Sequence, residues 1–233
     1  MEVGNAGFWA QFLQLDHLLS KTAAFLLAIT LHDFLQAGLA FYLGDRLPRK
    51  QGRLSLNPLA HLDALGLVML LFGPYGWSRK VQVHPEAFGP RSRIKTAMVY
   101  GAGPLLHLGL GILFWWMSFA IPLAAPDDWS ASVEGEYSSL QSWPSWLLAG
   151  LQGFIYWGYI VNMMLFILHL LPLHPSDLWK TVGQIVPERW KTRISRAERW
   201  TTLLLVAILV TPIGRLMLEK VFQWWSMAVM RLF

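Results

Sequence analysis

Residues 22–43, TAAFLLAITLHDFLQAGLAFYL, form an apolar run of membrane-spanning length that carries His32, Asp33 and Gln36 in its middle. Side chains four residues apart share one face of a helix, so His32 and Gln36 point the same way and Asp33 lies beside them. Ionisable groups inside a spanning segment are costly, and by default they mark a functional site that faces protein or trapped water. The segment therefore predicts a functional site within a membrane-spanning helix.

The composition is typical of a membrane protein. Of the 233 residues, 55% are hydrophobic and 14% are charged, whereas about 25% of the residues in a soluble domain are charged. The apolar residues cluster in runs that could cross a bilayer, which predicts an all-α polytopic membrane protein. The net charge of +5 does not indicate nucleic-acid binding, because the basic residues lie in short loops beside apolar runs. That pattern predicts that the basic loops are cytoplasmic. The absence of Cys excludes disulfides and thiolate metal sites.

Two further apolar runs, residues 96–121 and 146–171, are expected to span the membrane. Residues 64–72 are apolar but too short to span, and basic loops lie on both sides of them, so we expect a re-entrant or half-buried connector. In the basic loop that follows, residues 81–83 alternate apolar and polar side chains and could form a short strand. The acidic residues 122–142 should form a loop on the outer face.

No internal repeat or linker divides the chain, which predicts a single membrane domain over all 233 residues. Residues 1–21 are expected to be an interfacial N-terminal segment, residues 22–182 the core, and residues 183–233 additional C-terminal amphipathic and transmembrane helices. Within the last part, residues 200–214 are expected to form a short span. Residues 216–233 form either a further span or an amphipathic surface helix, and we favour the surface helix.

The spacing of HDFLQA at residues 32–37 is that of the zinc-binding H-E-x-x-H helix, in which two His bind the metal and Glu activates water. Other notable stretches follow in order along the chain: GRLSLNPLAHLDALG at 52–66, GWSRKVQVHP at 76–85, AGPLLH at 102–107, and Asn162 followed by LHLLPLHPSDLW at 168–179. Taken together, these stretches resemble the site-2 protease family, zinc metalloproteases that cut transmembrane helices within the bilayer. The resemblance is to the short bacterial branch that lacks a PDZ domain, here with a degenerate active-site motif.

The resemblance implies a core of three transmembrane helices with a membrane-embedded connector and a zinc site slightly below the cytoplasmic surface. By position, His32 is the first zinc ligand and Asp177 the third. Gln36 stands in place of the second His, and a neutral amide oxygen is a weak zinc ligand. Asp33 stands in place of the catalytic Glu as general base, with a side chain one methylene shorter and therefore a shorter reach.

Compared with the family pattern, the chain also has histidines at three additional positions. His107 and His169 occupy positions where the family has Asn, and His174 occupies a position where it has Pro. One hypothesis is a rewired metal site of His32 and Asp177 with either His169 or His174. The alternative is that these histidines are ordinary hydrogen-bonded groups inside a bundle.

Polar positions outside the metal ligands receive simpler interpretations. The resemblance also makes Asn162, His169 and His107 candidates for substrate binding. In the connector, His61 and Asp63 are interpreted as loop-ordering groups, and Asn57 is expected to cap or turn the chain before Pro58.

The resemblance implies a zinc metalloendopeptidase that hydrolyses peptide bonds of transmembrane substrates near the cytoplasmic face of a bacterial cytoplasmic membrane. The altered motif leaves a second hypothesis open, an inactive pseudoprotease that binds transmembrane segments as a regulator or chaperone. A third is a membrane protein that handles metal or small ions. The expected partners are a transmembrane protein segment and the lipid bilayer, with no nucleic acid.

Overall fold

The computed structural model describes residues 15–120 and 145–231, and these residues are predominantly helical. Three helices are long, α2 (Leu15–Tyr42), α5 (Ser92–Ala120) and α6 (Ser145–His169). The other elements are α3 (Leu47–Lys50), η2 (Pro58–Ala60), α4 (Ala64–Met69), η3 (Pro85–Phe88), α7 (Asp177–Ile185), α8 (Glu188–Val210) and α9 (Pro212–Met230). The predicted N-terminal residues 1–14 and the acidic loop at 122–142 lie outside the described residues.

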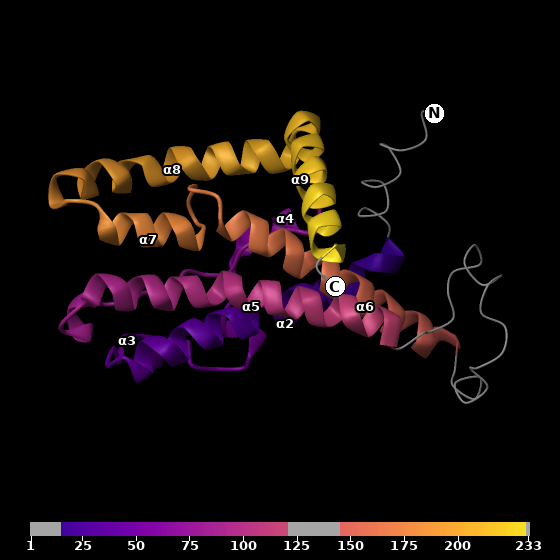
Figure 1. Ribbon diagram of the computed structural model, residues 1–233, viewed down its shortest axis with the longest axis horizontal. Helices are drawn as coiled ribbons and strands as arrows, with labels where there is room; N and C mark the ends of the chain where they lie inside the picture. Colours follow the sequence, from indigo (N-terminus) through magenta and orange to yellow (C-terminus); the bar gives the residue numbers. More distant parts are fainter. Residues whose placement is uncertain (1–14, 121–144, 232–233) are drawn as a thin grey trace.

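Three helices are long and apolar enough to cross a membrane, over Leu18–Tyr42, Ser92–Phe119 and Leu147–His169. They correspond to the three predicted spans, and the prediction of an all-α polytopic membrane protein is confirmed. In Figure 1 these helices lie side by side, with α5 running antiparallel to α2 and α6. The helix of the first span begins at Leu15, so residues 15–21, predicted as part of an interfacial segment, continue directly into it.

Small side chains allow the three spans to pack closely. On α2, Ala24 and Ala28 are buried against an apolar cluster that includes Trp157 of α6. A Cβ atom added to Gly158 would lie 2.6 Å from the ring of Phe114, so α5 and α6 are in contact at this point. Transmembrane helices associate through such close packing, because lipid tails are as apolar as the side chains they would replace.

The connector between α2 and α5, residues 43–91, is irregular and contains only short helices, as expected for a segment that does not span. Its helix α4 has six residues, and Asp63 caps the helix by accepting a hydrogen bond of 2.9 Å from the Gly66 amide. Asn57 caps η2 in the same way, through the Leu59 amide, which confirms the predicted cap.

The prediction of a short strand at residues 81–83 was wrong. Within the described residues the structure contains no strand, and one isolated bridge joins Leu62 to Ser78 in the connector. Val81 is buried, Gln82 is exposed and Val83 packs against the cluster around Phe88, so the alternation in the sequence reflects packing. An extended segment becomes a strand only when a neighbour supplies its backbone hydrogen bonds.

The C-terminal helices differ from the predicted division. Residues 200–214 were expected to form a separate short span, but α8 runs without interruption from Glu188 to Val210. Helix α9 then begins at Pro212, at an angle of 79° to α8, and the pair together is apolar enough for one broken span or a re-entrant loop. Figure 1 shows α9 standing across the end of α8. Next to the break, the buried hydroxyl of Tyr75 in the connector donates a hydrogen bond to the Leu209 carbonyl.

Replacing Tyr75 with Phe removes this donor while keeping the ring. We expect the free energy of unfolding to fall by about 1 kcal/mol, the usual net contribution of one buried hydrogen bond, and the thermal midpoint in detergent to fall with it. Tyr42→Phe is the matched control, because the Tyr42 side chain is exposed. Equal midpoints for the two variants would contradict a stabilising role for the contact between Tyr75 and Leu209.

Candidate metal centre

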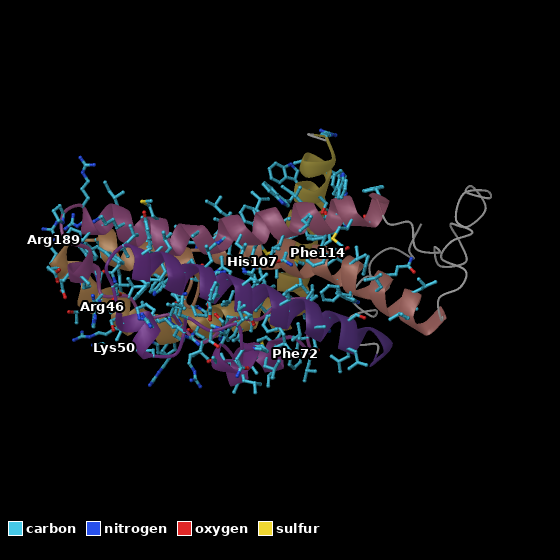
Figure 2. The ribbon with its side chains drawn as sticks, turned by 90° about the horizontal axis from the view of Figure 1, so that it is seen from below. Arg46, Lys50, Phe72, His107, Phe114 and Arg189 are labelled. Atoms are coloured by element: carbon cyan, nitrogen blue, oxygen red, sulfur yellow. The ribbon has the colours of Figure 1, made fainter. Side chains whose placement is uncertain are left out.

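Three histidines from the three spanning helices meet in the middle of the bundle. His32 comes from α2, His107 from α5 and His169 from α6, and all three are buried. Their ring centroids lie 4.8 Å (His32–His107), 4.5 Å (His32–His169) and 5.4 Å (His107–His169) apart. One ring nitrogen from each lies within 4.8 Å of the others, close enough for the group to hold a metal ion. Figure 2 shows His107 near the centre of the bundle.

The carboxylate of Asp177 completes this group. Asp177 is the first residue of α7, and the Ser176 side chain caps the helix by accepting a hydrogen bond of 3.1 Å from the Trp179 amide. Lys180 Nζ donates to Asp177 Oδ1 at 2.7 Å. Burial alone would raise the pKa of Asp177, but the Lys180 ammonium beside it holds that pKa well below its usual value. This ion pair favours the charged form of the carboxylate.

The other oxygen of Asp177 faces the histidines. Oδ2 lies 3.1 Å from His32 Nε2 and 3.0 Å from His169 Nδ1. Despite these distances, both nitrogens lack a partner with hydrogen-bonding geometry among the described residues. Two buried imidazole nitrogens and a carboxylate oxygen thus converge without being satisfied by one another. Two His and one carboxylate, with a fourth position open, are also the ligands of catalytic zinc sites. The residues therefore fit a zinc ion.

Gln36 donates to the site. Its Nε2 donates to Asp177 Oδ2 at 2.9 Å and to the Tyr100 carbonyl at 3.4 Å. The second contact has a local cause, because Pro104 lies inside α5 and has no N–H for the carbonyl four residues before it. The two acceptors set the orientation of the amide. Gln36 Oε1 has no hydrogen-bond partner among the described residues.

The connector holds the carboxylate of Asp33. Asp33 Oδ1 accepts from Ser78 Oγ at 2.8 Å and lies 4.0 Å from His32 Nε2. Asp33 Oδ2 lies 3.3 Å from the Arg53 guanidinium and 3.1 Å from His61 Nδ1. Burial lowers the pKa of Arg53, and the charge of Asp33 opposes that shift. Asp33 is thus fixed beside the histidines by donors from the connector.

These partners of Asp33 were missed at the level of sequence. Arg53 is one of the basic residues that the sequence places in loops, and His61 was interpreted as a loop-ordering group. Both are buried and contact the predicted general base. The available signal was GRLSLNPLAHLD at residues 52–63, which contains both residues and was the strongest element of the family resemblance.

The remaining candidates are separated by the structure. Asn162 lies beside the candidate metal centre formed by His32, His107, His169 and Asp177, with Oδ1 3.0 Å from His107 Nδ1. His174 lies apart, because its Nδ1 pairs with Thr202 Oγ1 at 2.8 Å and its Nε2 lies 3.9 Å from Glu198. Burial lowers the pKa of His174, although Glu198 opposes the shift. Of the two proposed substitute ligands, His169 is the one that lies with His32 and Asp177.

A curated protein of Bacillus subtilis (strain 168) named "Putative zinc metalloprotease YwhC" is similar to this chain. The two are 27% identical over 208 residues, which cover 89% of this chain and 88% of that protein. No family model matches the chain, and no solved structure matches it. The similarity supports a metalloprotease family and a metallopeptidase-like function for this membrane protein.

Gly103 on α5 allows the backbone to approach the centre. A Cβ atom at this position would lie 2.2 Å from His32 Cε1, 2.6 Å from Gln36 Nε2 and 2.7 Å from Asp177 Oδ2. We expect Gly103→Ala to displace these groups and to destabilise the protein by about 1–3 kcal/mol, the usual cost of overpacking. Thermal unfolding and bound zinc would measure both effects.

Gly109→Ala on the same helix is the matched control, because no atom lies within 4 Å of an added Cβ there. Ala is a better helix former than Gly, so Gly109→Ala should leave stability unchanged or raise it slightly. If Gly103→Ala behaved like this control, the close approach of α5 to the centre would be wrong.

Proposed function

We propose that the protein is an intramembrane zinc metallopeptidase of the site-2 protease type that hydrolyses peptide bonds of transmembrane segments. The observation that carries the proposal is the convergence of His32 Nε2, His169 Nδ1 and Asp177 Oδ2 inside a bundle of three spanning helices. The similarity to a protein named as a zinc metalloprotease supports the same chemistry. The family resemblance of the ordered sequence stretches adds the membrane-embedded substrate.

His32, His169 and Asp177 would hold the zinc, so that His169 takes the role that Gln36 has lost. Bound zinc would supply a Lewis acid and lower the pKa of a bound water. Gln36 and Lys180 would orient the Asp177 carboxylate, because Gln36 donates to Oδ2 and Lys180 to Oδ1.

Asp33 would act as the general base. Its Oδ1 lies 4.0 Å from His32 Nε2, so this oxygen faces the same space as the proposed ligands and would accept a proton from water there. Ser78, Arg53 and His61 keep the carboxylate in that orientation. Restricted placement matters, since an error of about 1 Å in a catalytic group can cost on the order of 10²-fold in rate.

The substrate would enter from the bilayer and be cut near the cytoplasmic face. Figure 2 shows Arg46, Lys50 and Arg189 at one end of the bundle, the end opposite Phe114. Basic residues at one end favour a cytoplasmic orientation of that end. In this proposal the protein lies in a bacterial cytoplasmic membrane.

One observation favours a second candidate function, an inactive protein that binds transmembrane segments as a regulator or chaperone. Asp177 already receives Lys180 on Oδ1 and the Gln36 amide on Oδ2, so protein groups alone partly neutralise the carboxylate. The two functions differ in whether the buried group binds metal.

The first test is the metal content of the purified protein, measured by elemental mass spectrometry. We expect about one zinc per chain, as in a mononuclear catalytic site, and loss of the zinc in His32→Ala and His169→Ala. His84→Ala is the control, because His84 is exposed in the connector and should leave zinc unchanged. A chain that binds no zinc even in excess metal would exclude the peptidase and leave the regulator.

The second test separates metal binding from hydrolysis. We expect Asp33→Asn to keep zinc and to lower cleavage of a membrane-anchored reporter by at least 10²-fold, because general-base catalysis contributes about 10²–10⁴. Ser78→Ala should lower cleavage less, since Arg53 and His61 still hold Asp33. Unchanged cleavage in Asp33→Asn would remove this residue from the mechanism.

A further inference from the structure

We propose that Asn162 and His107 are positioning residues that set the tautomer of His32, so that His32 presents an unprotonated Nε2 to the centre. The proposal rests on the proposed function only where zinc is concerned, because the tautomer is a property of the metal-free chain. It gives Asn162 and His107 a role different from the substrate binding that the family resemblance implied.

The first step is the orientation of the Asn162 amide. Asn162 Nδ2 donates a hydrogen bond of 2.8 Å to the Gly158 carbonyl, one turn earlier on α6. A carbonyl can only accept, so this atom of Asn162 must be the nitrogen. The reverse orientation would place two acceptor oxygens 2.8 Å apart. Asn162 Oδ1 therefore faces His107, at 3.0 Å from its Nδ1.

The second step is the tautomer of His107. Because Asn162 Oδ1 only accepts, His107 Nδ1 must carry the hydrogen of this contact. A neutral imidazole has one N–H, so His107 Nε2 has a lone pair and accepts. The atom that faces this lone pair is His32 Nδ1, at 2.9 Å. His32 Nδ1 must therefore donate, and His32 carries its hydrogen there.

The third step is the consequence at the centre. A neutral His32 with its hydrogen on Nδ1 has a bare lone pair on Nε2, the atom that lies 3.1 Å from Asp177 Oδ2. His32 Nε2 has no partner with hydrogen-bonding geometry among the described residues. A lone pair and a carboxylate oxygen at this distance repel each other unless a cation binds both. The hydrogen-bond relay from Asn162 through His107 to His32 thus prepares His32 as a metal ligand through Nε2.

Burial makes each hydrogen bond of this relay necessary, because water cannot replace it. The exposed fractions of Asn162, His107 and His32 are 1%, 0% and 1%, so bulk water has no access to replace a partner. An unsatisfied buried polar group costs about 1–3 kcal/mol, which is enough to select one tautomer. Metal-binding histidines commonly depend on such a partner at the other ring nitrogen, and its loss lowers metal affinity by about 10- to 100-fold. Here the partner is itself a histidine, and the relay joins all three spanning helices.

The test is the ring-nitrogen protonation of His32 in zinc-free protein, read by NMR of ¹⁵N-histidine-labelled full-length chain in nanodiscs. The His32 signals are assigned by their loss in His32→Gln. We expect the wild type to carry the hydrogen on Nδ1. Asn162→Leu keeps the side-chain size but removes the acceptor, so His32 should become a mixture of tautomers. Zinc affinity, measured by chelator competition, should fall by about 10- to 100-fold in the same variant.

Tyr159→Phe is the matched control, because it removes a hydrogen bond to Ser226 from the same helix without touching the relay. It should change neither the tautomer nor the zinc affinity. A wild-type His32 protonated on Nε2 would overturn the proposal without any variant, and so would an unchanged tautomer in Asn162→Leu. If His32 has the expected tautomer but the wild type binds no zinc, the metallopeptidase fails and the relay stands.

Discussion

The charge on Asp177 is the constraint on which the rest of the structure depends. A carboxylate buried in a membrane bundle is tolerated only when other groups compensate it, and one left alone would neutralise or move. Here compensation comes from two elements at once: Lys180 on α7 donates to Oδ1, and Gln36 on α2 donates to Oδ2. The packing of the bundle therefore serves to bring these donors to one oxygen pair, and the approach of α5 at Gly103 closes the arrangement.

The chemistry is divided between two kinds of backbone. The atoms suited to hold a metal come from the spans and from the start of α7, whereas the proposed base is positioned by the irregular connector. Irregular backbone leaves N–H and C=O groups that need partners outside a regular helix. The capped turns at Asn57 and Asp63 supply such partners, so the connector can be both irregular and well placed.

Hydropathy and loop charge were enough to predict the three spans and a non-spanning connector between the first two, because both follow from the cost of placing backbone and charge in lipid. The sequence also directed attention to the candidate site around His32, because ionisable groups in a span are costly. The finer arrangement could not be predicted. Nothing in the spacing shows that Gln36 points its nitrogen at Asp177, or that His174 turns toward Thr202. Those outcomes depend on contacts between distant helices.

Gln36 also limits which amino acids could replace it at position 36. Its amide serves both the Tyr100 carbonyl that Pro104 leaves without a helical partner and the oxygen of Asp177 that faces His169. A histidine at position 36 could not donate from one atom to both the Tyr100 carbonyl and Asp177. It would also compete with His169 for the same oxygen of Asp177. A change at position 36 alone would therefore disturb both contacts, so the residues at 36 and 169 constrain each other through the shared oxygen of Asp177.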